Sequence, residues 1–426
     1  MILIGAVVGI WLSSQLSLPV ITNQQVGTNG GITLEFSAEM QRDSVAQRLS
    51  ISHTQNFQLV WQGRAVTIWP NSNWKPGSMI SVHLASGAES LNGREIPRDF
   101  NSQIIVRQPE LIYLSSRSGK DQIWKSTLTG ETETLSEQTE VLETAVSRDG
   151  EWIAFSLNNN QGGADLWIMD RNGEEQRMLV ECGNSVCSEI SWQPFQQKFA
   201  YSRYLNGLQG IPRVWTVDVQ TGEIFSFFED EEIIGHYPAF SPNGSALSIF
   251  SPVLGGIYLQ DLQKGASSVI QTSIPQQAVW SPDGQVVYFL RGIGLEGQPV
   301  DKIYRFDLKN NEISIAQGFE DDLFNYGTPA WSPDGSIVAI PLRQMDGGLS
   351  TQIWLFDKDG VLVEEITNDP VYIHGGLAWS GDGSQLRIQR LAIDSSQQQS
   401  DILVWNAYNG ENSFIVEGAF GGDWLP

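Results

Sequence analysis

The stretch Val279-Trp-Ser-Pro-Asp-Gly-Gln-Val-Val-Tyr-Phe-Leu-Arg291 decides the fold, because close copies of it recur along the chain. Each copy joins two apolar runs through a tetrapeptide like Ser-Pro-Asp-Gly. Pro presets φ, Asp caps its own backbone and Gly accepts positive φ, so the tetrapeptide predicts a hairpin turn and not a catalytic Asp. The other copies are AVSRDGEWIAFS (145–156), ISWQPFQQKFAYS (190–202), AFSPNGSALSIFS (239–251), AWSPDGSIVAIPLR (330–343) and AWSGDGSQLRIQRL (378–391).

The copies are spaced like the blades of a β-propeller. One position recurs about every 40 to 50 residues, which is the length that a four-stranded blade uses. A third strand with an aromatic residue follows each copy, as in Gln352-Ile-Trp-Leu-Phe-Asp357. The sequence therefore predicts a propeller over residues 109–426. The recurring position is occupied by Val146, Trp192, Phe240, Trp280, Trp331, Trp379 and Trp424.

The two ends of this region complement each other. The first copy, at 110–137, begins without an inner strand, whereas the last copy, ending at Pro426, consists of little else. Pairing of the C-terminal strand with the first blade would leave no open sheet edge between the first and last blades. We therefore predict seven blades, with six or eight as alternatives if a weak copy is irregular. The weakest copy is the one at Trp192, where Phe195-Gln196 replaces Asp-Gly.

Residues 22–108 show a different pattern. Short runs such as ITLEF (32–36), FQLVW (57–61), AVTIW (65–69) and MISVHLA (79–85) are separated by turn residues. This spacing predicts a small β-sandwich. Its Trp61, Trp69 and Trp74 are interpreted as core or edge residues rather than as a carbohydrate platform.

Two resemblances extend this reading. Residues Gly31 to Ser37, with Trp61, Trp69-Pro70, Lys75-Pro76-Gly77 and Leu91-Asn92-Gly93, resemble bacterial Ig-like domains of the S-layer type. That resemblance implies a spacer or adhesion module without chemistry. The WSPDG copies followed by IW-x-x-D strands, over about residues 110–426, resemble TolB-like propellers. TolB itself carries a different, α/β N-terminal domain, so the resemblance concerns the propeller alone.

The TolB-like resemblance implies work in the cell envelope by binding proteins. Related propellers regulate access to serine peptidases or, in some polysaccharide lyases, carry a metal site. A peptidase needs a G-x-S-x-G nucleophile elbow, and the sequence contains none.

The net charge of the chain limits the classes of partner that it can bind. The chain has 25 Lys+Arg and 49 Asp+Glu, a formal net charge of -24. Nucleic acid is recognised by neutralising phosphates with Lys and Arg, so this balance disfavours it. Residues 1–108 hold 7 Lys+Arg and 6 Asp+Glu, which leaves 18 and 43 for the remainder. The acidity therefore belongs to the predicted propeller.

The N-terminus indicates export. Residues 1–12 are uncharged and apolar but reach only about 18 Å as a helix, too short to span a bilayer. We interpret residues 1–21 as a signal peptide or a marginal membrane anchor, which places the protein in the periplasm or at the cell surface. An ordinary buried strand or helix is the alternative.

The numbers of cysteines and histidines limit the metal sites that the chain can form. Two Cys and four His are too few for the common zinc patterns, and we predict no metal and no cofactor. In an oxidising compartment, Cys182 and Cys187 can close a small disulfide ring. Two unpaired, small apolar side chains are the alternative.

Polar groups are expected to converge where the inner strands begin. His236 and His374 lie four and five residues before Phe240 and Trp379. Convergent polar groups in a concave site are the usual basis for a binding hypothesis. Ordinary hydrogen bonding at the rim remains an alternative, as does a divalent-ion site. Positions a similar number of residues before the other recurring positions are occupied by Glu143, Glu189, Tyr237, Gln277 and Tyr326.

Acidic residues cluster between each outer strand and the next inner strand, where connections share one face. The densest run is Glu229-Asp230-Glu231-Glu232. A face of one sign attracts cationic partners, either a basic protein surface or Ca²⁺, although solubility alone would explain the same charges. Further acidic residues in such connections are Glu137, Glu140, Glu143, Glu181, Glu189, Glu320, Asp321, Asp322 and Asp369.

These features favour a non-enzymatic, exported binding or scaffold protein that recruits a protein or peptide through the propeller. The enzymatic alternative is a polysaccharide lyase or hydrolase that uses His236, His374 and Tyr326. A purely mechanical surface-layer component is a third hypothesis.

Overall fold

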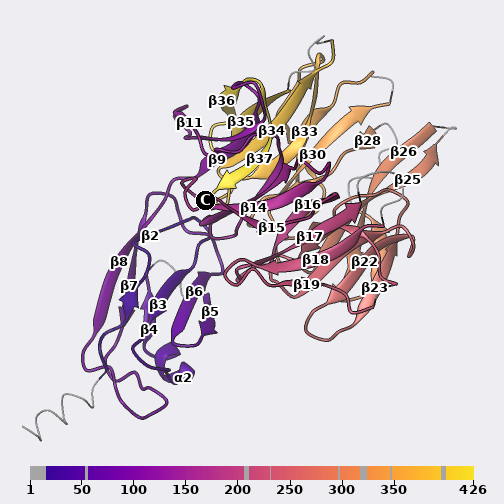
Figure 1. Cartoon of the computed structure of the whole chain (residues 1–426). Coiled ribbons are helices and arrows are strands. Elements are labelled where there is room, and N and C mark those ends of the chain that lie inside the picture. The colour runs from indigo at the N-terminus through magenta and orange to yellow at the C-terminus, as the bar shows by residue number, and fades with distance from the viewer. Residues whose placement is uncertain are drawn as a thin grey trace, which may run out of the picture. The chain divides into compact units, whose positions relative to one another are not determined.

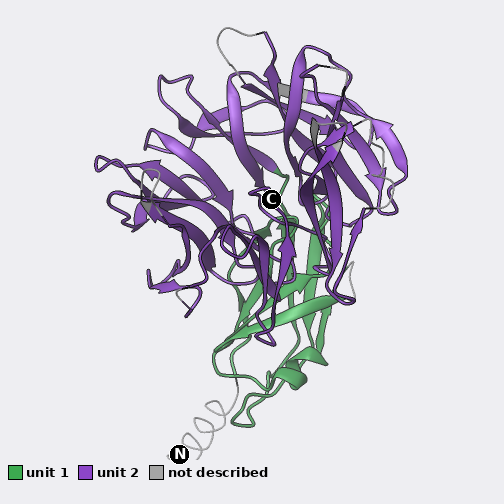
Figure 2. Cartoon of the chain, turned by 90° about the vertical axis from the view of Figure 1, so that its right-hand side faces the viewer, with its two compact units in different colours: residues 1–109, 426 green, residues 110–425 purple. Residues whose placement is uncertain are grey.

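The structure is a computed structural model of the chain. It describes residues 16–52, 56–205, 211–230, 232–295, 298–316, 324–345, 348–394 and 400–426. Strands dominate it, and the helix of the described residues is the short α2 (Arg42–Ala46). The chain forms two compact units, residues 1–109 with Pro426 and residues 110–425 (Figure 2). The all-β fold predicted from the sequence is confirmed.

The first unit contains two four-stranded sheets that share one core. In β7, for example, Ile80, Val82 and Leu84 are buried whereas Met79 and Ser81 are exposed, the alternation of a half-buried strand. Apolar residues of both sheets form a single buried cluster, as in a sandwich. In spatial order the sheets are β1 (Val20–Ile21), β3 (Ile32–Glu35), β6 (Ala65–Pro70), β5 (Phe57–Gln62) and β2 (Gln25–Val26), β8 (Phe100–Val106), β7 (Met79–Leu84), β4 (Leu49–Ile51).

The module begins earlier than the sequence suggested. Leu16 is buried in this core, and Leu18 and Ile21 pack against it. Residues 16–21, which we assigned to the leader, therefore lie within the sandwich. The rest of the predicted signal peptide or anchor, residues 1–15, lies outside the described residues. In the described part of the chain, no helix is long and apolar enough to cross a membrane.

The second unit repeats one antiparallel sheet of about four strands. Its strands, grouped by sheet, are β9 (Glu110–Ser115), β10 (Gln122–Ser126), β11 (Thr132–Thr134), β37 (Ala419–Leu425); β12 (Val141–Val146), β13 (Trp152–Asn158), β14 (Ala164–Asp170), β15 (Arg177–Val180); β16 (Ser185–Trp192), β17 (Lys198–Leu205), β18 (Arg213–Asp218), β19 (Ile224–Ser226); β20 (His236–Phe240), β21 (Ala246–Ser251), β22 (Gly256–Asp261), β23 (Ser267–Gln271); β24 (Val279–Trp280), β25 (Val286–Leu295), β26 (Gln298–Asp307), β27 (Glu312–Ile315); β28 (Phe324–Tyr326), β29 (Ala330–Trp331), β30 (Ile337–Gln344), β31 (Gln352–Asp357), β32 (Leu362–Glu365); β33 (Tyr372–Trp379), β34 (Gln385–Ala392), β35 (Ser400–Asn406) and β36 (Glu411–Val416).

We interpret this grouping of strands as seven blades. The β12–β15 and β16–β19 groups form one sheet because a single parallel bridge, Ala164 to Val186, links β14 to β16. Each group otherwise repeats the meander of the others. In the β28–β32 group the inner strand is divided into β28 and β29, both paired with β30.

The C-terminal strand closes the first sheet. β37 pairs antiparallel with β9, with Phe420 opposite Leu114 and Trp424 opposite Leu111 (Figure 1). The innermost strand of the first blade therefore comes from the end of the chain. This is the closure that the complementary first and last copies predicted.

The Ser-Pro-Asp-Gly turns form as predicted. Ser281 Oγ donates to Asp283 Oδ1 at 2.6 Å and accepts from the Val286 N–H at 3.0 Å, while Gly284 takes a φ of 69°. In the weak copy the positive φ moves to Phe195, at 65°, one residue before the glycine position. That copy keeps the hairpin by changing its turn type.

At four of the recurring positions, a Trp side chain ties its blade to the one before it. Trp379 Nε1 donates to the Ala330 carbonyl at 3.1 Å, and Trp424 Nε1 donates to Ala378 at 2.9 Å. The acceptor is always the residue just before the equivalent position in the preceding blade. The same bond joins Trp192 to Ala145 and Trp280 to Ala239.

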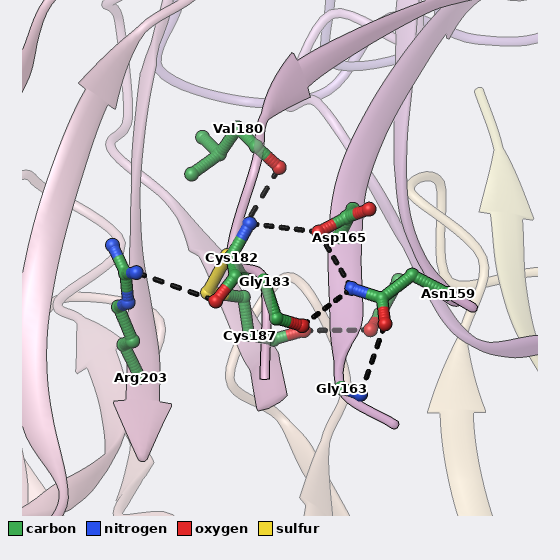
Figure 3. Close-up of a disulfide and its surroundings, with 9 residues drawn as sticks. Asn159, Gly163, Asp165, Val180, Cys182, Gly183, Cys187 and Arg203 are labelled. Atoms are coloured by element: carbon green, nitrogen blue, oxygen red, sulfur yellow. Dashed lines mark hydrogen bonds between the residues drawn. A yellow bond between two sulfur atoms is a disulfide. The ribbon is translucent and has the colours of Figure 1, made fainter. Parts of the chain in front are cut away.

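Cys182 and Cys187 form a disulfide between β15 and β16 (Figure 3). The predicted pairing is therefore present in the structure. Asp165 Oδ1 accepts from the Cys182 N–H at 2.7 Å and from Asn159 Nδ2 at 2.9 Å, and Arg203 Nη2 donates to the Cys182 carbonyl at 3.3 Å. These bonds fix the short ring at the junction of two blades.

The indole bonds allow a controlled test. Trp379 and Trp331 are both half-buried at the same blade position, but Trp331 Nε1 has no hydrogen-bond partner in the described chain. Trp379→Phe removes ring volume and a hydrogen bond, whereas Trp331→Phe removes ring volume alone. We expect Trp379→Phe to lower the free energy of unfolding by about 1 kcal/mol more than Trp331→Phe, measured by chemical denaturation. Equal losses would show that the indole bonds contribute nothing to ring stability.

Candidate functional site

Bulges in the inner strands shape the candidate site. The register shifts at the same place in β16, β20, β33 and β37. At this place Gly376 and Gly421 have positive φ, as do the non-glycine residues Glu189, at 59°, and Tyr237, at 55°. A left-handed non-glycine residue costs free energy and persists only where the surroundings hold it.

A carboxylate from the preceding blade holds each of these two bulges. Glu189 Oε2 accepts from the Tyr237 N–H at 2.7 Å. In the same way, the Glu143 carboxyl accepts from the backbone N–H groups of Glu189 and Ile190. Side chains three residues before the recurring position thus bind the equivalent position of the next blade.

The second oxygen of Glu189 contacts a histidine. Glu189 Oε1 lies 3.3 Å from His236 Nδ1, and the His236 and Tyr237 ring centroids are 4.2 Å apart. Because a carboxylate accepts, Nδ1 carries the proton in this contact. Burial raises the pKa of Glu189, but the polar groups around its carboxylate, among them His236 and the Tyr237 N–H, outweigh it, so the pKa lies below its usual value.

The pKa of Glu143 is shifted in the opposite direction. Burial, opposed by the backbone N–H groups and reinforced by the neighbouring Glu189 charge, raises the pKa of Glu143 to about 7. Its Oε1 is buried and has no hydrogen-bond partner in the described chain. Two adjacent carboxyls with pKa values driven apart are a mark of functional sites.

Gln277 adds a side chain from a fourth blade to this group. Its Nε2 donates to the Pro238 carbonyl at 2.9 Å. The structure therefore brings together five of the predicted funnel residues across four consecutive inner strands. We call them the inner-strand cluster, and they are Glu143, Glu189, His236, Tyr237 and Gln277.

Tyr326 and His374 have other partners in other blades. Tyr326 is 4% exposed, with its ring 4.9 Å from Lys302 Nζ. His374 is 3% exposed and its Nδ1 lies 2.9 Å from the Thr351 carbonyl, while burial lowers the pKa of the ring and keeps it neutral. These side chains are too enclosed to meet a polysaccharide together with His236.

The predicted acidic run lies on the connection from β19 to β20. Glu229, Asp230 and Glu232 are exposed, and Asp230 Oδ1 accepts from the Glu232 N–H at 2.9 Å. Glu231 lies outside the described residues, as do Glu320, Asp321 and Asp322. The run, here called the acidic connection, ends a few residues before His236.

Sequence reasoning missed Arg148. Its guanidinium lies 4.8 Å from the Phe195 ring centre, and its Nη1 donates to the Pro242 carbonyl at 3.3 Å. It thereby joins the hairpin turns of three blades. The available signal was its position, since Arg148 stands where other copies have Pro.

The described residues contain no candidate metal site. Within the described ranges, no three His, Cys, Asp or Glu side chains are placed to hold an ion. The site offers hydrogen-bond acceptors, one charged carboxylate and the two neighbouring rings of His236 and Tyr237.

Comparisons with known proteins agree with the two-part fold. Residues 15–103 match the family model described as a bacterial Ig-like domain. The match begins before Leu16 and so includes the residues that the structure adds to the sandwich. No curated protein matches the chain.

Solved structures resemble the chain at low identity. TolB from Acinetobacter baumannii is 15% identical, with 89% of this chain and 83% of that chain covered and a TM-score of 0.47. A prolyl endopeptidase is 13% identical, with coverages of 89% and 51% and a TM-score of 0.54. Prolyl oligopeptidase B from Galerina marginata, bound to a 25mer macrocyclization substrate, is 13% identical, with coverages of 72% and 48% and a TM-score of 0.52.

The chain thus spans about half the length of the two peptidases. At these identities the likeness concerns the fold. The β-propeller and the N-terminal bacterial Ig-like module predicted from the sequence are confirmed.

The Glu143 carboxyl makes stability depend on pH. It holds its proton to about pH 7 in the folded chain but only to about pH 4.5 when unfolded. The folded state therefore binds more protons between these values, and the contribution of this group to stability falls as pH rises through them. We expect Glu143→Gln to raise the free energy of unfolding at pH 8 relative to wild type by on the order of 3 kcal/mol, and to change it little at pH 4.

Denaturation at several pH values checks this expectation. Glu364→Gln, on exposed β32, is the matched control for loss of one charge. A Glu143→Gln effect that is the same at pH 4 and pH 8, or no larger than that of the control, would contradict it.

Proposed function

We propose that the protein is a non-enzymatic, exported binding or scaffold protein of the bacterial envelope, whose propeller recruits a protein or peptide with a basic surface. The observation that carries the proposal is the acidic connection, which presents exposed Glu229, Asp230 and Glu232 a few residues before His236 of the inner-strand cluster. Since nearly all of the negative charge belongs to the second unit, its field favours cationic partners.

The bacterial Ig-like module serves as a spacer in this proposal. Its net charge is close to zero and its apolar residues are used in its own core. The segment before Leu16 supplies the export signal or a tether to the membrane. The TolB-like resemblance of the propeller supports work in the envelope through protein binding.

One contact favours a second candidate, an enzyme that uses His236. Glu189 on Nδ1 leaves His236 Nε2 as an acceptor, which is how a carboxylate orients a general base. Propeller-type hydrolysis or lysis of a polysaccharide would need this base. Loss of polysaccharide cleavage in His236→Ala, with binding of the partner retained, would establish this candidate in place of the first.

Charge reversal tests the recruiting role. We expect the triple variant Glu229→Lys, Asp230→Lys, Glu232→Lys to lose the proteins that the wild type captures by cross-linking in envelope extracts, with yields reduced about tenfold. The control Glu364→Lys, Glu365→Lys, Glu411→Lys makes the same change in net charge at exposed positions in other blades.

The comparison of the two triple variants decides the result. Capture by the control at wild-type level, together with loss in the first variant, supports recruitment through the acidic connection. Equal capture by all three proteins, or no capture by any, would overturn the proposed function.

A further inference from the structure

Glu143 Oε1 is the starting observation. It is buried and unpaired in the described chain, as is the neighbouring Thr144 Oγ1. A buried acceptor without a donor costs about 1–3 kcal/mol, so it calls for an explanation. Capping of the next bulge accounts for the carboxyl's bonds to the Glu189 and Ile190 N–H groups, and it leaves Oε1 without a role.

The backbone at the same place is strained. Glu189 and Tyr237 take positive φ where the equivalent positions of two other blades have Gly376 and Gly421. Such conformations cost about 1–3 kcal/mol each for residues with a side chain. Bulges of this kind re-aim side chains, and here they retain a carboxylate and an aromatic ring where glycine would be cheaper.

The groups available to a ligand are acceptors and aromatic faces. Glu189 is ionised, and Glu143 offers Oε1 beside it. The ring centroids of His236 and Tyr237 are 4.2 Å apart, with the ring planes tilted. An anion would be repelled here, whereas a guanidinium or ammonium group could donate to both carboxyls and pack on a ring.

The two carboxyls differ in access. The side chains of Glu189 and His236 are 17% and 22% exposed, whereas Glu143 Oε1 is buried. The arrangement thus combines a partly exposed, charged carboxylate with a buried acceptor. A slender cationic side chain fits this arrangement of carboxyls better than a bulky ligand does.

We infer that Glu143, Glu189, His236 and Tyr237 form a subsite for one cationic side chain, arginine or lysine, of a bound peptide. Glu189 pairs with the cation, Glu143 Oε1 accepts its innermost hydrogen bond, and the His236–Tyr237 rings cover it. The inference rests on the proposed function, because it names the chemistry by which a basic partner is read. Gln277 and the acidic connection lie outside the subsite.

A cation beside Glu143 must also displace its proton. The charged side chains on the strands packed against β12 are Glu189 of β16, Asp423 of β37 with its neighbour Arg387, Lys125 of β10 and Glu110 of β9. Burial is the main cause that raises the pKa of Glu143 to about 7, and of these charged groups Glu189 is the one whose charge adds to it. At pH 7 the carboxyl is therefore close to half protonated, and a bound cation drives it to full ionisation.

Calorimetric titration of the full chain tests the subsite. The probe is the peptide acetyl-(Gly-Arg)₄-amide, compared with the same peptide carrying citrulline, an uncharged analogue of arginine. We expect the arginine peptide to bind about tenfold more tightly. Titration at pH 7 in buffers of different ionisation enthalpy should show release of up to about half a proton per site filled.

The variants separate this inference from the proposed function. Glu143→Gln should abolish the proton release and, like Glu189→Gln, weaken arginine-peptide binding about tenfold. The acidic-connection triple variant should bind more weakly but still release protons. Circular dichroism confirms that each variant is folded.

Four results would contradict these expectations, in different ways. Unchanged proton release in Glu143→Gln, or equal binding of the arginine and citrulline peptides, overturns the subsite. Loss of binding in the acidic-connection variant alone overturns the subsite and leaves recruitment by charge standing. No binding of either peptide to the wild type counts against a basic partner, and with it the proposed function.

Discussion

Unpaired backbone groups at a sheet edge are the constraint on which the second unit depends. A meander of four strands leaves N–H and C=O groups open along both edges, and a ring must join its first and last blades. The pairing of β37 with β9 does this with residues from opposite ends of the unit, Trp424 opposite Leu111. The junction carries a buried Arg387, whose Nη1 donates to the Gly421 carbonyl, and a buried Asp423 whose charge it balances. Closure thus depends on specific pairing as well as on apolar packing.

Several joints between blades use one or both of two recurring hydrogen bonds of the inner strand. Near its end, an indole N–H reaches the carbonyl before the equivalent position of the preceding blade, as from Trp280 to Ala239. Nearer its start, a carboxyl of one blade accepts from the bulge N–H of the next, as from Tyr237 to Glu189. The second joint needs a charged or polar side chain in a partly buried place. In our proposal, structural capping and ligand recognition therefore draw on the same residues.

The sequence predicts what is encoded locally. Spacing, the Ser-Pro-Asp-Gly turn and the complementary ends indicated a closed propeller because each depends on a few adjacent residues, and even the weak turn at Phe195 was identified. The offsets that grouped Tyr326 and His374 with Glu189 assumed one register for every inner strand. The division of β28 from β29 breaks that assumption for Tyr326, and Tyr326 and His374 both stand five residues before the recurring Trp, whereas Glu189 stands three before it. Burial of Glu143 is likewise a property of the assembled ring.

The burial of Glu143 also bears on whether the cluster binds or cleaves. Hydrolysis by a carboxylic acid and a carboxylate requires the two groups to flank the scissile bond, with the acid able to reach the leaving oxygen. Here one side of the Glu143 carboxyl is occupied by the Glu189 and Ile190 N–H groups, and Oε1 is enclosed. Glu189 in turn caps Tyr237 through Oε2 and contacts His236 through Oε1. Three of the four carboxyl oxygens therefore already have partners within the propeller, and our proposal assigns the fourth, Glu143 Oε1, to a side chain of the partner.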